Sequence, residues 1–218
     1  MIDAIVIDTA AKPTAAIIWL HGLGADGHDF EPIVPEVTPQ GRAWRYIFPH
    51  APVRPVTINN GMHMRAWYDI KSFDRNAAED VDGFRASEAS VRELIDSQVA
   101  RGIPSNRIVL AGFSQGGAVS LYALPRLPNR LAGVMALSCY LPGQSSFAAE
   151  RVHENDATPI LLAHGTADPV VALPLGTAAR DYLKAQGYEV EWHDYPMPHS
   201  VSPAEINDIR QFLTRVLP

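Results

Sequence analysis

Four short, largely apolar runs recur along the chain and indicate buried strands. They cover residues 15–20, 107–111, 132–137 and 159–164. Runs of this length without regular polar alternation are typical of parallel strands that are covered on both faces. Residues 189–194 alternate instead, which predicts a strand nearer an edge of the sheet, and the alternation at Ile5 and Ile7 predicts a short half-buried strand.

Apolar residues at helical spacing occupy the intervals between these runs. One stripe ends before Gly102 and consists of Phe84, Val91, Leu94, Ile95 and Val99. Residues 115–124 and 173–186 also have helical patterns. The last helix begins with the capping box Ser202-Pro203-Ala204-Glu205, and its apolar stripe is Ile206, Ile209, Phe212, Leu213, Val216 and Leu217.

This alternation of strand and helix predicts an α/β fold with an open, mostly parallel central sheet and helices on both faces. Residues 48–69 are rich in proline and show neither period, so they are expected to form a long ordered loop over the carboxyl ends of the strands. We find no internal repeat or linker. A single domain spanning residues 1–218 is therefore expected.

Composition narrows the classes of partner. The 218 residues carry 18 Lys and Arg against 24 Asp and Glu, a net charge of −6 without blocks of like charge, which argues against a nucleic acid or an anionic membrane. The single cysteine, Cys139, excludes an intrachain disulfide. Acids rather than basic residues follow Met1, and no apolar run approaches the roughly 20 residues of a membrane span. A cytoplasmic protein with a small-molecule substrate is expected.

The clearest chemical signal is the sequence Gly112-Phe113-Ser114-Gln115-Gly116. It directly follows a predicted buried strand and directly precedes a predicted helix. A serine in such a sharp turn is held in a strained conformation with its hydroxyl exposed, and the small glycines on either side avoid collisions there. Ser114 is therefore the candidate nucleophile, and the first N–H groups of the following helix would face any negative charge that develops beside it.

A serine nucleophile needs a histidine base and a carboxylate that orients the base. Asp168 lies just after the strand at 159–164, and His199 lies in a proline-shaped loop just before the last helix. In parallel sheets the triad follows the order Ser, Asp, His, which favours this pair. The competing residues fit less well: His164 and His193 fall within or at the end of strands, and the acids are Asp156 and Asp194.

The glycine-rich loop at residues 22–27 admits two interpretations. It matches the dinucleotide fingerprint G-x-G-x-x-G after a strand, but prolines interrupt the stretch that follows and no acid stands about 20 residues later. The favoured interpretation is an oxyanion hole, with one N–H from Leu23 and the other from Gln115. The sequence predicts no cofactor and no metal, since it contains no H-E-x-x-H motif or close His/Cys set.

Five ordered segments together resemble the phospholipase/carboxylesterase family of α/β-hydrolases, which includes bacterial carboxylesterases and acyl-protein thioesterases. The segments are LHGLGAD at 20–26, MRAWYD at 64–69, GFSQGG at 112–117, HGTAD at 164–168 and PMPHS at 196–200. The resemblance implies an α/β-hydrolase fold without a large lid domain. It also implies that Ser114, Asp168 and His199 form the triad and that the N–H groups of Leu23 and Gln115 form the oxyanion hole.

The same resemblance implies that the loop at 64–69 borders the acyl site. Apolar wall candidates are Met64, Trp67, Phe113, Val170 and Leu173. The family often has proline where this chain has Ala172, a departure that touches the pocket wall and not the triad.

The expected function is a serine hydrolase that cleaves carboxylic esters of short to medium acyl chains, with thioesters or lysophospholipids as alternative substrates. The other classes considered are a dinucleotide-dependent oxidoreductase and a non-catalytic binding module; the intact Ser-Asp-His set argues against the latter. Apolar residues in the segment 50–70 are consistent with a homodimer.

Overall fold

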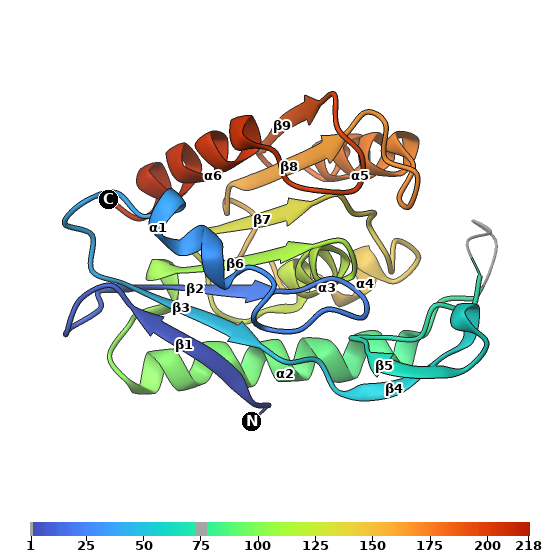
Figure 1. Cartoon of the computed structure of the whole chain (residues 1–218), viewed down its shortest axis with the longest axis horizontal. Coiled ribbons are helices and arrows are strands. Elements are labelled where there is room, and N and C mark those ends of the chain that lie inside the picture. Colours follow the sequence, from blue (N-terminus) through green and yellow to red (C-terminus); the bar gives the residue numbers. More distant parts are fainter. Residues whose placement is uncertain (1, 73–77) are drawn as a thin grey trace.

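A seven-stranded sheet forms the centre of the molecule (Figure 1). The computed structural model describes residues 2–72 and 78–218. β1 pairs antiparallel with β3, and every other pair in the sheet is parallel. In spatial order the strands are β1 (Ala4–Asp8), β3 (Trp44–Pro49), β2 (Ala15–Leu20), β6 (Ile108–Phe113), β7 (Gly133–Leu137), β8 (Ile160–Gly165) and β9 (Val190–Tyr195).

Helices cover both faces of this sheet, as the sequence predicts. α2 (Val81–Ala100), α3 (Gln115–Ala123), α4 (Phe147–Glu150) and α5 (Leu173–Ala185) contribute to one core, and α1 (Val34–Val37) and α6 (Pro203–Val216) contribute to the other. Strand β2 shows the division, because Ile18 packs into the first core and Ile17 into the second. Successive side chains of a strand point to opposite faces, so a fully apolar run serves both cores.

The long helix α2 buries a stripe that differs from the predicted one at its end. Asp80 caps the helix, its side chain accepting a hydrogen bond from Gly83 N over 3.1 Å. The buried positions continue from Ile95 to Gln98, and Val99 is 42% exposed. Position 98 lies two helical turns after Val91 and so shares its buried face, whereas position 99 is rotated by a further 100° toward solvent. No helix among the described residues is long and apolar enough to cross a lipid bilayer.

The segment 48–69, predicted as a long ordered loop, contains regular strands that the sequence did not predict. The segment contains the end of β3 and a two-stranded antiparallel hairpin, β4 (Val53–Val56) and β5 (Met62–Arg65). A lone ribbon tolerates Pro55 because a strand with one partner needs only half of its backbone hydrogen bonds. The turn places Asn60 and Gly61 at φ 55° and 74°, a conformation that these two residue types adopt most readily.

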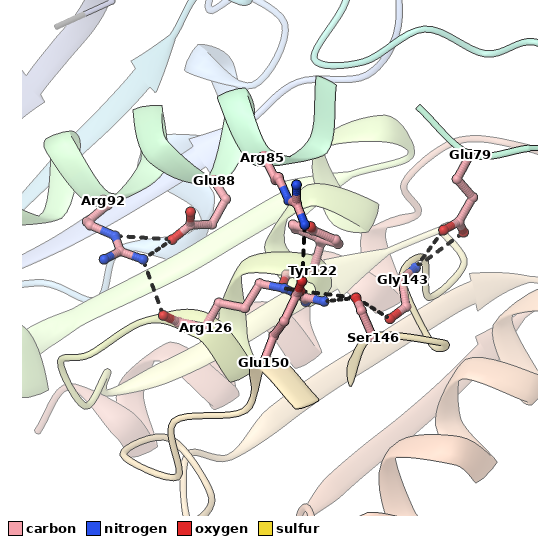
Figure 2. A network of polar contacts seen from close by, with 9 residues as sticks. All are labelled: Glu79, Arg85, Glu88, Arg92, Tyr122, Arg126, Gly143, Ser146 and Glu150. Carbon is pink, nitrogen blue, oxygen red and sulfur yellow. Dashed lines mark hydrogen bonds and ion pairs between the residues drawn. The ribbon is translucent and has the colours of Figure 1, made fainter. Parts of the chain in front are cut away.

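A network of charged side chains holds the segment between β7 and β8 against α2 and α3 (Figure 2). The guanidinium of Arg126, in a residue only 8% exposed, donates to Glu150 over 2.6 Å, to Ser146 over 2.9 Å and to the carbonyl of Tyr122 over 2.5 Å. Arg85 from α2 contacts the other carboxylate oxygen of Glu150 over 3.4 Å. The network therefore links the end of α3, the helix α4 and the first turns of α2.

Candidate active site

Ser114 occupies the turn between β6 and α3 at φ 53° and ψ −117°. A non-glycine residue in this region costs on the order of 1–3 kcal/mol and is retained where the surroundings enforce it. The enforcing contacts are tight: a Cβ at Gly112 would overlap the backbone of Gly116, and a Cβ at Gly116 would overlap the carbonyl oxygen of Leu20. The turn therefore depends on both glycines, and the side chain of Ser114 remains partly exposed.

Asp168 and His199 lie in contact at the carboxyl ends of β8 and β9. His199 Nδ1 is 2.6 Å from Asp168 Oδ2, and the carboxylate is fully buried while the imidazole is partly accessible. A carboxylate can only accept, so Nδ1 carries the proton and Nε2 keeps its lone pair. This is the tautomer that a general base requires.

The ring of His199 also lies beside the residue that precedes the nucleophile. Its centroid is 4.7 Å from that of Phe113, with the planes tilted by 45°. The glycine-rich loop closes the other side, since a Cβ at Gly22 would lie 3.5 Å from Ser114 Cβ. Three loops that are distant in sequence thus meet around Ser114.

The N–H groups of Leu23 and Gln115 have no hydrogen-bond acceptor within residues 2–72 and 78–218. Gln115 is the first residue of α3, where helical N–H groups lack an intrahelical partner. Leu23 belongs to the loop that the hydrogen bond from Gly24 N to Arg65 O, at 2.9 Å, anchors to β5. Free donors from two elements beside the serine are suited to a developing oxyanion.

The imidazole of His21 fixes the start of this loop. Its Nε2 accepts from Ala51 N over 3.0 Å, so Nδ1 carries the proton and donates to the Gly22 carbonyl over 2.7 Å. Burial lowers the pKa of His21, which keeps this neutral tautomer in place.

The side chain of Gln115 has a structural role that the sequence did not reveal. Its Oε1 accepts from Trp67 N over 2.7 Å and its Nε2 donates to the Tyr68 carbonyl over 2.8 Å. The indole of Trp67 then donates to the His21 carbonyl over 2.9 Å, and Ser87 donates to the Trp67 carbonyl over 2.5 Å. The residue after the nucleophile is thereby connected to the 64–69 segment and to the glycine-rich loop.

The predicted wall residues fall into two groups. Met64, Phe113 and Leu173 are partly exposed and Val170 is 50% exposed, and Met64 lies beside Gly24. Trp67, by contrast, is 1% exposed. Trp67 is therefore buried against Gln115 and the His21 carbonyl and does not form an exposed wall, whereas the side chains of the other four are accessible.

The competing residues take part in contacts of their own. Asp156 pairs with Arg151 over 2.7 Å, and His193 pairs with Glu191 over 2.8 Å. Burial raises the pKa of Cys139 well above its ordinary value, so it remains a thiol at neutral pH. Among the described residues no three His, Cys, Asp or Glu side chains are grouped as a metal site.

The glycines of the 22–27 loop do not open a long helix. The next helical elements are the single turn Glu31–Ile33 and the four residues of α1. A dinucleotide site places its pyrophosphate at the N-terminus of a helix that starts at the glycines, so the fingerprint lacks its structural context.

Known proteins resemble this chain over nearly its whole length. The family model described as Phospholipase/Carboxylesterase matches residues 1–217. Acyl-protein thioesterase 1 from Neurospora crassa is 42% identical over 224 residues, covering 98% of this chain and 91% of the relative. The crystal structure of Zea mays acyl-protein thioesterase 2 has a TM-score of 0.89 at 30% identity and covers 100% of both chains. That of Arabidopsis thaliana SOBER1 has a TM-score of 0.87 at 35% identity, covering 94% of this chain and 99% of the other.

Proposed function

The chain belongs to the phospholipase/carboxylesterase family of α/β-hydrolases, and from that premise we propose that Ser114, Asp168 and His199 are the catalytic triad of a serine esterase. Members of this family hydrolyse esters or thioesters. The proposed substrates are carboxylic esters of short to medium acyl chains. The observation that carries the assignment is the 2.6 Å contact between His199 Nδ1 and Asp168 Oδ2, with the His199 ring packed against the residue before Ser114.

The proposed reaction begins with the attack of Ser114 Oγ on the acyl carbonyl carbon. His199 Nε2 accepts the serine proton while Asp168 holds Nδ1. The tetrahedral oxyanion accepts hydrogen bonds from the N–H groups of Leu23 and Gln115, and loss of one such donor costs roughly 3 kcal/mol of transition-state stabilisation. The alcohol leaves with the proton from His199, and water then hydrolyses the acyl-enzyme with His199 as the base.

Several relatives are named acyl-protein thioesterases, which supports thioesters as a second candidate substrate class for this chain. A thioester gives the same acyl-enzyme, so the same three residues serve both reactions. Lysophospholipids are a third candidate, since they carry an acyl ester of the same type. These candidate substrates therefore differ in the group that leaves and not in the acyl-enzyme that forms.

Turnover of paired substrates tests the proposal. We expect the purified chain to hydrolyse p-nitrophenyl esters, thioesters of the same acyl groups and lysophosphatidylcholine at different rates, all of them lost in Ser114→Ala. Retention of turnover in a folded Ser114→Ala protein would overturn the assignment of the nucleophile. If the thioester is turned over faster than the ester at every acyl-chain length, the thioester replaces the ester as the proposed substrate.

We also propose a domain organisation, a cellular compartment and an oligomeric state for the enzyme. One sheet built from strands of both halves of the chain supports a single domain over residues 1–218, and one buried thiol suits the reducing cytoplasm. Val53 and Met62 on the β4–β5 hairpin are 60% and 64% exposed, which supports a homodimer. Light scattering on the wild type and on a Val53→Ser, Met62→Ser double variant tests the dimer, and cell fractionation tests the compartment.

A further inference from the structure

The backbone of Val171 lies between Asp168 and a second buried histidine. Asp168 Oδ1 accepts hydrogen bonds from Val170 N over 2.8 Å and from Val171 N over 2.9 Å. The carbonyl of Val171 in turn contacts His164 Nε2 over 2.7 Å. Since a carbonyl oxygen only accepts, His164 Nε2 carries a proton and donates it. His164 therefore fixes the residue that holds one oxygen of the acid.

The same imidazole faces the other oxygen of the acid. His164 Nε2 is 3.7 Å from Asp168 Oδ2, the oxygen that accepts from His199. The distance is too long for a hydrogen bond, but it places the positive end of the N–H dipole beside the carboxylate. His164 thus acts on the carboxylate at both oxygens, on Oδ1 through the backbone of Val171 and on Oδ2 through its own N–H dipole.

The position of His164 is itself tightly defined. The side chain is 1% exposed, and its ring lies parallel to that of Trp192 within 20° at a centroid distance of 6.3 Å. On the Nδ1 side the backbone of Gly176 in α5 approaches so closely that a Cβ there would overlap the imidazole. A ring held between a strand, a helix and a loop has one orientation, and only the Nε2 edge reaches the acid loop.

We infer that His164 is a positioning residue for the acid of the triad, acting through the Val171 carbonyl to orient Asp168 toward His199. This inference depends on the proposed triad and adds a member that neither accepts the serine proton nor touches the substrate. The orientation of the acid decides which nitrogen of the base carries its proton, so a rotated carboxylate lowers kcat more than it changes KM.

Two substitutions of His164 separate donation from packing. His164→Leu fills similar space without a donor, and His164→Gln places an amide N–H near the position of Nε2. We expect His164→Leu to lower kcat for p-nitrophenyl butyrate about 100-fold with KM changed less than about threefold. We expect His164→Gln to recover kcat to within about tenfold of wild type.

Gly176→Ala gives an independent variant in which His164 is still present. The added methyl group must displace the imidazole, so we expect a loss of kcat in the same direction as for His164→Leu. Leu183→Ala, in the buried face of the same helix α5, is the control for general destabilisation. It is expected to lower the midpoint of thermal unfolding and to leave kcat at a temperature below that midpoint near the wild-type value.

A proton NMR measurement on the free enzyme gives a readout that needs no turnover. The His199 Nδ1–H proton in its short bond to Asp168 is expected to resonate far downfield in wild type and His164→Gln, and to shift upfield or vanish in His164→Leu. Equal kcat in folded wild type and His164→Leu, or equal losses in the Leu and Gln variants, would overturn the inference. Turnover that survives in both Ser114→Ala and Asp168→Asn would instead overturn the proposed function.

Discussion

The side chain of Gln115 accepts a hydrogen bond from the backbone N–H of Trp67 over 2.7 Å, across 48 positions of the chain. The same carboxamide donates to the carbonyl of the next residue, Tyr68. The residue that supplies a proposed oxyanion donor from its backbone thus uses its side chain to hold the 64–69 segment.

Replacement of Gln115 by leucine should therefore weaken catalysis and stability together. The change leaves the Trp67 N–H and the Tyr68 carbonyl buried without a partner, at a cost of about 1–3 kcal/mol each. We expect kcat to fall about tenfold or more as the backbone N–H at 115 moves. Gln98→Leu, a change at a buried glutamine in α2, should leave kcat unchanged. Equal kcat values for the two variants would contradict this role of Gln115.

Asp168→Asn tests the tautomer of the base. The amide oxygen can still accept from Val170 and Val171, so its NH₂ group faces His199 Nδ1 and forces that nitrogen to act as an acceptor. Nε2 then carries the proton and cannot take one from Ser114, and kcat should fall by about 10⁴-fold with little change in stability. The control Asp156→Asn alters an ion pair elsewhere and should leave kcat intact; a similar kcat in both variants argues against Asp168 as the acid.

Gly116→Ala tests the packing of the nucleophile turn. Its Cβ would overlap the carbonyl oxygens of Leu20 and His21, so β2 and α3 must separate. We expect a loss of about 1–3 kcal/mol in the free energy of unfolding measured in urea. At Gly22 the nearest atoms lie at 3.5 Å, and Gly22→Ala should be tolerated. Equal unfolding free energies for the two variants would show that the turn can relax.

The buried carboxyl group of Glu205, in the first turn of α6, should make stability depend on pH. Burial raises the pKa of Glu205 to about 8, and the charge of the nearby Asp208 adds to the rise. No hydrogen bond of normal geometry reaches either carboxylate oxygen from the described residues. Only one of the two hydrogen bonds of the predicted capping box is present. Ser202 Oγ accepts from Glu205 N over 3.2 Å, but the Glu205 carboxylate does not accept from the Ser202 backbone N–H.

The direction of the effect follows from proton binding. Between the ordinary pKa of 4.5 and about 8 the folded chain keeps a proton at Glu205 that the unfolded chain has lost. Stability from this group is therefore complete below pH 4.5 and declines as the pH rises toward 8. Urea unfolding at a series of pH values should show a negative slope in wild type that Glu205→Gln reduces. An unchanged slope in Glu205→Gln would place the source of the dependence elsewhere.

The strands that are buried on both faces were the part of the fold most easily predicted from the sequence. Helices cover both sides of the sheet at β2, β6, β7 and β8, so these strands are continuous apolar runs. Such a run can be recognised in the sequence without knowledge of the strands that it pairs with. β3 combines Trp44 and Arg45 with prolines that follow, and the β4–β5 hairpin is exposed, so neither has a clear period. The edge strands β1 and β9 were predictable from their alternation, so the strands that the sequence missed are β3 and the two of the hairpin.

The candidate site divides in a similar way. Ser114, Asp168 and His199 could be proposed because each follows a strand, and parallel strands bring their carboxyl ends together. The contacts of Gln115 with Trp67 depend on where the 64–69 segment packs, which no local pattern specifies. The buried position of Trp67 was missed for the same reason, because an aromatic residue beside a site fits both a wall and a support.

Covalent labelling tests most directly whether Ser114 is an activated nucleophile. Wild type and Ser114→Ala are incubated with a fluorophosphonate, and the adduct is measured by intact mass and located by peptide mapping. Ser138→Ala is the matched control, since Ser138 is another strand-end serine with positive φ, at 50°, but is fully buried. We predict one adduct on Ser114 in wild type and Ser138→Ala and none in Ser114→Ala. A folded wild-type protein that acquires no adduct, or acquires it at another residue, would contradict the assignment.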